Sequence, residues 1–186
     1  MKFVIQKVLS ANVKVDNKIV GEIEKGILVL IGFGHNDNKQ NIPFAVNKLL
    51  SLRLWDDENG KRWSKSIKDL SYGVLLVSQF TLHATLKGNK PDFHNAMDPK
   101  IANELYDEFL CQLKSKHKGN VSSGKFGELM AVSLVNNGPV TIEWEYPNKE
   151  ITKEDNKNTN SNTKKLSNFE NDVIDKNVEI NKNINI

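Results

Sequence analysis

Two short polar motifs contain the residues of this chain that are best suited to chemistry. Ser78-Gln79-Phe80-Thr81 follows the apolar residues 74–77, a pattern typical of a buried strand. Sites in α/β folds commonly lie at the carboxyl ends of such strands. The second motif, Asn136-Asn137-Gly138-Pro139-Val140-Thr141, contains Asn-Gly, the commonest hairpin signal. A proline directly after it removes a donor just where a strand resumes, so a plain hairpin explains the motif incompletely.

Other kinds of active site find less support. The chain has one cysteine and four histidines, namely Cys111, His35, His83, His94 and His117. None of them pairs with another at the spacing of zinc ligands, so we expect no metal and no cofactor. The G-x-S-x-G signature of a serine hydrolase is absent, although His83 or His94 could still approach Ser78 in space. Gly32-Phe33-Gly34 is only a weak indication of a nucleotide loop, and Cys111 is expected to be buried beside an apolar helix stripe.

The elements around these motifs are predicted to alternate between strand and helix. Apolar and alternating residues predict strands at 3–5, 13–15, 26–33, 74–77, 129–135 and 140–146. One helix is predicted over residues 42–53, and a second begins after Asp98 as N-cap with Pro99 in its first turn. Residues 136–139 are expected to join the last two strands. This order predicts an α/β fold with a mixed β-sheet and two main helices.

The composition of the chain changes near Pro147. Residues 1–147 are expected to form the functional domain, whereas residues 148–186 are rich in Asn and Lys and are predicted to be a disordered, dispensable tail. The net charge of the 186 residues, +3, is too small to argue for RNA contact by itself. The longest apolar run is too short to span a bilayer, no secretory signal is evident, and a lone cysteine suits a reducing compartment. We therefore expect a cytoplasmic protein with no membrane partner.

Taken together, the two motifs resemble the paired signatures of the D-aminoacyl-tRNA deacylase family, S-Q-F-T-L and N-x-G-P-V-T. The stretches 52–55, 87–94 and 124–130 also look like that family, so the resemblance covers residues 1–146. It implies hydrolysis of the ester between a D-amino acid and the 3′ end of tRNA. It also implies hydrolysis of the same ester where glycine has been attached to a non-cognate tRNA. It also implies a deacylase-like fold and a tight homodimer with its active site at the subunit interface.

The resemblance further implies which residues form the site. The catalytic residues would be Ser78, Gln79, Phe80 and Thr81, and the substrate-binding residues Gly138, Pro139, Asn136, Phe126 and Met130. A cis Gly138–Pro139 unit would enter the partner's pocket and exclude the side chain of an L-residue. The N–H groups of Phe80 and Thr81 are candidates for binding the oxyanion, while the 2′-hydroxyl of the tRNA assists the attacking water. Thr81 as a covalent nucleophile is less favoured, because no base lies at a fixed offset.

Lys7 is a departure from the family, which usually has arginine at this position. Lysine lacks the planar fork of arginine, so if that arginine steadies the Gly-Pro segment, Lys7 is expected to hold it less rigidly. Two alternatives stay open at this stage. One is a non-catalytic RNA-binding or editing-like module on the same fold, and the other is an esterase that acts on small molecules.

Overall fold

The computed structural model describes residues 1–147. Its strands are β1 (Lys2–Val15), β2 (Lys18–Ile23), β3 (Gly26–Gly32), β4 (Arg53–Trp55), β5 (Lys65–Ser66), β6 (Gly73–Ser78), β7 (Thr85–Lys87), β8 (Lys90–Asp92), β9 (Val121–Ser123) and β10 (Ala131–Glu145). Its helices are α1 (Ile42–Ser51), α2 (Ile67–Leu70) and α3 (Pro99–Lys116), with short 3₁₀ helices η1 (Lys39–Asn41) and η2 (Phe80–His83). The disorder predicted for residues 148–186 lies outside the described residues.

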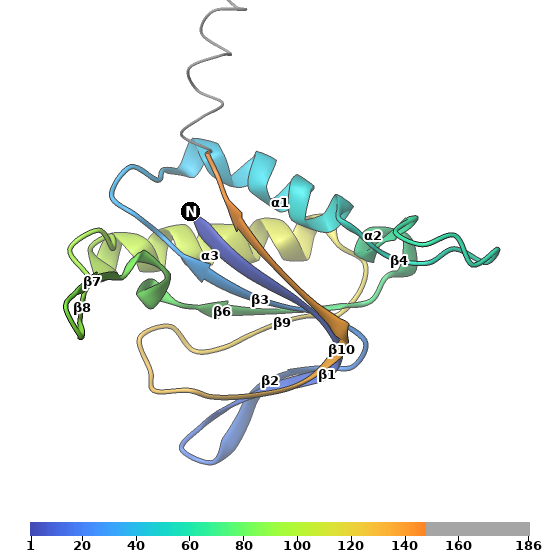
Figure 1. Ribbon diagram of the computed structural model, residues 1–186, viewed down its shortest axis with the longest axis horizontal. Helices are drawn as coiled ribbons and strands as arrows, with labels where there is room; N and C mark the ends of the chain where they lie inside the picture. The colour runs from blue at the N-terminus through green and yellow to red at the C-terminus, as the bar shows by residue number, and fades with distance from the viewer. Residues whose placement is uncertain (148–186) are drawn as a thin grey trace, which may run out of the picture. The chain divides into compact units, whose positions relative to one another are not determined.

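Six strands form one mixed sheet that curls on itself (Figure 1). The order is β10-β1-β3-β6-β9, and β2 pairs with the second half of β1. β1 runs antiparallel to its neighbours, whereas β3, β6 and β9 are parallel to one another. β2 approaches β9 so closely that a Cβ on Gly21 would lie 2.3 Å from the carbonyl oxygen of Ser123. The predicted mixed sheet is confirmed, and its curvature brings distant strands into contact.

The sheet separates two hydrophobic cores. α1 and α3 cover one face, where Val74 and Leu76 are fully buried in the larger core. The alternate residues Leu75 and Val77 point to the other side, into a smaller core enclosed by the curled sheet. β6 is therefore buried on both faces, as its uninterrupted apolar sequence predicted.

The two main helices have the predicted signals at their starts. Asp98 caps α3, because its carboxylate accepts from the N–H groups of Lys100 (2.9 Å) and Ile101 (3.4 Å). The buried stripe of α3 includes Phe109 and Leu113. Cys111 lies on the face of α3 opposite this stripe and is exposed, so the expectation that it is buried was wrong. No helix within residues 1–147 is both long and apolar enough to cross a membrane.

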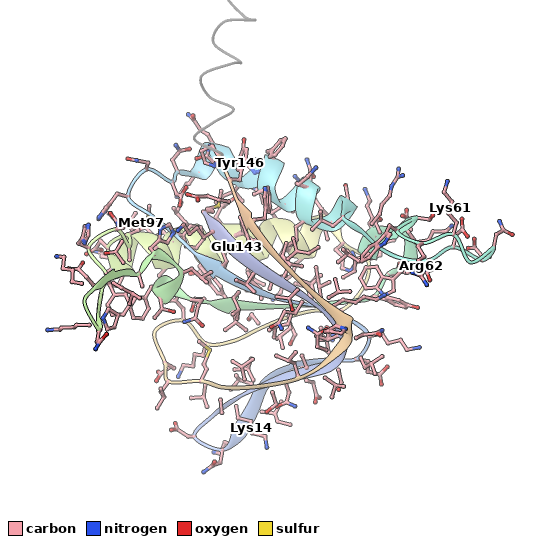
Figure 2. All side chains as sticks on the ribbon, in the orientation of Figure 1. Lys14, Lys61, Arg62, Met97, Glu143 and Tyr146 are labelled. Carbon is pink, nitrogen blue, oxygen red and sulfur yellow. The ribbon has the colours of Figure 1, made fainter. Side chains whose placement is uncertain are left out.

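Two long strands replace two predicted pairs of strands. Residues 3–5 and 13–15 belong to the single strand β1, and residues 129–135 and 140–146 contribute mainly to the single strand β10. β1 and β10 pair on both sides of a local irregularity near Lys7. Two small hairpins were not predicted: β4–β5, with Lys61 and Arg62 in the loop between its strands (Figure 2), and β7–β8, which follows η2.

Candidate active site

The end of β6 offers two main-chain donors. Ser78 is the last residue of the strand, and the N–H of Gln79 donates to the carbonyl of Ile31 at 2.7 Å. The chain then enters η2, whose first internal hydrogen bond runs from the N–H of Leu82 to Gln79 at 3.2 Å. None of the hydrogen bonds among residues 1–147 uses the N–H of Phe80 or Thr81. The first N–H groups of a helix have no partner within it, so this pair is available to an anionic oxygen.

The side chains around these donors are occupied in other contacts. Gln79 Nε2 donates to Thr81 Oγ1 at 2.5 Å. Phe80 is 58% exposed, and its ring meets that of Phe93 edge-on, with 5.0 Å between ring centres. The ring of His94 is hydrogen-bonded to Asp92. Within the described chain, no hydrogen bond joins a histidine to the hydroxyl of Thr81, and no three His, Cys, Asp or Glu side chains gather as metal ligands.

His83 anchors η2 to β3 rather than serving as a base for Ser78. Its buried ring donates from Nε2 to the carbonyl of Gly32 at 3.1 Å, and burial lowers its pKa. A Cβ on Gly32 would lie 3.2 Å from the ring, and one on Gly34 would lie 2.7 Å from it. The two glycines that weakly indicated a nucleotide loop therefore provide the space for this histidine.

Phe126 and Met130 lie on the segment beside β6. The carbonyl of Leu76 accepts from the Tyr106 hydroxyl (2.8 Å) and from the N–H of Gly124 (2.9 Å). The Phe126 ring packs on Tyr106, with 5.6 Å between ring centres. Met130 folds back onto Gly124, where a Cβ would lie 2.5 Å from its sulfur. Both predicted residues thus flank the strand that ends at Ser78.

The second motif forms a bulge in β10. Gln6 pairs with Thr141 and Val8 with Asn136, so residues 137–140 all lie opposite Lys7. The exposed tip of this bulge contains the Gly138–Pro139 bond, which is cis. Residues 136–139 were expected to join two separate strands, but they lie within the single strand β10, which continues along β1 on both sides of the bulge.

Lys7 does not hold the bulge that it faces. Its ammonium lies 5.6 Å from the centre of the Trp55 ring, within the range of a cation–π interaction. None of the hydrogen bonds in the described part of the chain joins the Lys7 side chain to residues 137–140. The bulge is therefore supported by groups other than Lys7.

The two motifs lie far apart within one chain. Lys7, which faces the bulge, pairs with Ile27, and Ile27 pairs with Val74, whereas Ser78 is at the other end of β6. β1 and β3 separate β10 from β6. Steps of about 3.3 Å along a strand and about 4.8 Å between strands put the motifs roughly 20 Å apart. Figure 1 shows the sharp bend of β10 on the opposite side from the β7–β8 hairpin that follows η2.

Known proteins resemble the chain over nearly all of its described part. The family model described as D-Tyr-tRNA(Tyr) deacylase matches residues 4–145. The D-aminoacyl-tRNA deacylase of Dictyostelium discoideum is 42% identical over 151 residues, which are 80% of this chain and 100% of that protein. D-aminoacyl-tRNA deacylase 1 of Homo sapiens is 47% identical over 148 residues, 79% of this chain and 71% of its own length.

Two solved structures share the fold. One, titled c-Myc DNA Unwinding Element Binding Protein, has a TM-score of 0.76 and 46% identity, and covers 80% of this chain and 100% of its own. The other, titled as a probable eukaryotic D-amino acid tRNA deacylase, has a TM-score of 0.67 and covers 77% of this chain and 97% of its own. At 19% identity, that second likeness concerns the fold alone.

Proposed function

The chain belongs to the D-Tyr-tRNA(Tyr) deacylase family, and we propose that it hydrolyses the ester bond of D-aminoacyl-tRNA, releasing the amino acid and the tRNA. The proposal rests on two features that occur together in this family member. The N–H groups of Phe80 and Thr81 have no hydrogen-bond partner among residues 1–147, and the Gly138–Pro139 tip is exposed. We place the activity in the cytoplasm, because the single cysteine suits a reducing compartment.

The proposed chemistry needs little from side chains. Water adds to the ester carbonyl, and the oxygen that becomes negative accepts from the N–H groups of Phe80 and Thr81. The bond from the carbonyl carbon to the ribose 3′-oxygen then breaks, and that oxygen takes a proton. The neighbouring 2′-hydroxyl of the tRNA assists the water, which is consistent with the absence of a histidine at the Thr81 hydroxyl within residues 1–147.

A second copy of the chain would complete the site. About 20 Å separates the two motifs within one subunit, so one chain alone does not bring them together. Large apolar side chains are exposed around β10, with Leu129 at 95% and Val135 at 52%, and Leu9 of β1 is also exposed. Such a surface favours association with a second subunit. In this homodimer, Gly138 and Pro139 of the partner subunit face Ser78-Gln79-Phe80-Thr81.

Selection for the D configuration would follow from the position of the partner's Gly138–Pro139 tip beside the substrate. The protruding tip would lie against the α-carbon of the bound aminoacyl group, with Phe126 and Met130 flanking the terminal adenosine. The side chain of an L-residue would collide with the tip, whereas that of a D-residue would point to solvent. Rejection therefore depends on repulsion rather than on added attraction, and a glycyl group, having no side chain, would be accepted.

Single-turnover deacylation tests the proposal directly. The homodimer is expected to hydrolyse D-Tyr-tRNA much faster than L-Tyr-tRNA, with a rate at subsaturating protein that falls as salt rises. Binding of tRNA without hydrolysis would instead favour an RNA-binding module. Hydrolysis of free D-tyrosine esters at the same efficiency, independent of salt, would favour a small-molecule esterase.

Replacing Thr81 by alanine is expected to leave most of the activity. The proposed donor is the main-chain N–H, which survives the change, and the hydroxyl is hydrogen-bonded to Gln79 in the described chain. We expect kcat on D-Tyr-tRNA to fall by no more than about tenfold. An inactive, folded variant, together with an acyl-threonine trapped in the wild type, would restore Thr81 as the nucleophile.

Mixing two inactive variants is expected to restore activity. In a heterodimer of one subunit defective at Phe80 and one defective at Gly138, one of the two sites contains both intact motifs. Random exchange makes half of the dimers heterodimers, so about one quarter of the wild-type sites should return. The measurement is D-Tyr-tRNA deacylation after subunit exchange. Absence of any recovery, with exchange verified by mass spectrometry, would contradict a site completed by the partner.

A further inference from the structure

We propose that three side chains position the Gly138–Pro139 tip and thereby set the selectivity for D-aminoacyl groups. These side chains, which we call the amide clasp, belong to Gln6, Asn136 and Thr141. The inference rests on the proposed function. It gives Asn136 a positioning role at the base of the bulge, rather than direct contact with the substrate.

Asn136 closes the bulge by bridging its two ends. Its Oδ1 accepts from the N–H of Val140 at 2.8 Å, while its Nδ2 donates to the carbonyl of Val140 at 3.3 Å. The same Nδ2 donates to Thr141 Oγ1 at 3.1 Å. One side chain thus supplies both an acceptor and a donor to a stretch where the regular pairing with β1 is interrupted.

Gln6 connects this closure to the sheet. It pairs with Thr141 in the β1–β10 register, and its Nε2 donates to Thr141 Oγ1 at 3.3 Å. The Thr141 hydroxyl oxygen therefore accepts from two amides, one from each strand. The base of the bulge is tied to β1 by side chains at the point where the main-chain ladder resumes.

Val140 transmits the position of the clasp to the tip. Gly138 has a φ of +133°, and a Cβ at this position would lie 2.8 Å from Val140 Cγ2 and 3.2 Å from the Val140 nitrogen. The tip is therefore packed directly on the residue that Asn136 holds. Lys7, the residue opposite the bulge, lies over Trp55 instead. Within residues 1–147, the side-chain hydrogen bonds to residues 137–140 therefore come from the clasp.

Loosening the clasp should admit L-residues more than it harms D-residues. Steric rejection requires the tip to stay in place, whereas the proposed oxyanion donors belong to the other motif. In Asn136→Ala we expect the D-to-L ratio of kcat/KM on Tyr-tRNA to fall by about tenfold or more. The change should come mainly from faster L-Tyr-tRNA hydrolysis, because the tip that rejects L-residues is no longer held in place.

Two conservative pairs and one control make the test specific. Asn136→Asp retains the acceptor for Val140 and should recover part of the ratio lost in Asn136→Ala. Thr141→Val removes the shared hydroxyl, whereas Thr141→Ser keeps it and should remain selective. Ser133→Ala is the matched control, because Ser133 is an exposed residue of the same strand, paired with Asn12 away from the bulge. Each variant is assayed on both tRNAs as the homodimer.

Amide hydrogen exchange at Val140 provides a readout independent of activity. Exchange should accelerate at least about tenfold in Asn136→Ala and stay unchanged in Ser133→Ala. The clasp is overturned if Asn136→Ala and Thr141→Val both keep the D-to-L ratio within twofold of wild type, or if Val140 exchange is unaltered. Should Asn136→Ala fail to fold, the Thr141 pair decides. A wild-type protein inactive on D-Tyr-tRNA would contradict the proposed function instead, and Val140 exchange would still test the clasp.

Discussion

Replacing Phe80 by proline should lower kcat on D-Tyr-tRNA by about 10²–10³-fold relative to replacing it by alanine. Both variants lose the aromatic ring and its contact with Phe93, so the difference between them isolates the main-chain N–H. This N–H forms no hydrogen bond within residues 1–147, and proline therefore removes a donor to the substrate without breaking an internal bond.

The backbone at this position suits proline. Phe80 is the first residue of η2, where the fixed φ of proline is tolerated, and Gln79 before it has a φ of −148° and ψ of 78°, outside the helical region that a following proline disfavours. Single-turnover rates at saturating enzyme give the comparison, with thermal unfolding of both variants as the folding control. Equal rates in two folded variants would remove this N–H from the mechanism.

Replacing Gly138 by alanine is expected to reduce kcat/KM on D-Tyr-tRNA by about 10²-fold. A φ of +133° is rarely adopted by residues with a side chain, and the new methyl group would lie 2.8 Å from Val140 Cγ2. The tip must therefore shift. In the proposed dimer, the methyl group would also enter the space that the α-carbon of the substrate needs.

Gly60→Ala is the matched control for backbone strain. Gly60 also has a positive φ, +77°, but a Cβ there would meet nothing within 4 Å. This variant should lose some stability and retain its activity, because the β4–β5 turn is not part of the proposed site. If Gly138→Ala were as active as Gly60→Ala on both D-Tyr-tRNA and glycyl-tRNA, the tip would not lie against the substrate.

Sequence reasoning found the buried strands and the helix starts because their signals are local. The run at residues 74–77 and the cap at Asp98 each depend on neighbouring residues. β1 was split in two because the strand changes partner along its length, from β3 to β2. The alternation of buried residues breaks at this change, where Lys7, Leu9 and Ser10 are not buried. Long-range pairing maintains a strand that local alternation does not predict.

The candidate site was predictable in its parts and not in its arrangement. Each of the two motifs stands out in the sequence, yet neither motif indicates how far apart they lie in the folded chain. Gln6 was missed altogether, because its partner Thr141 is brought to it only by the pairing of β1 with β10. His83 was considered as a base, and only the packing of its ring against Gly32 and Gly34 reveals an anchor.

The bulge also bears on aggregation. In the sheet formed by residues 1–147, β10 is an edge strand of 15 residues, and a long regular edge is a template for pairing with other chains. The bulge divides this edge into two shorter segments, and Pro139 at its tip has no N–H to offer a neighbouring strand. The same four-residue bulge that presents the tip thus keeps the exposed edge from recruiting further copies into an open-ended sheet.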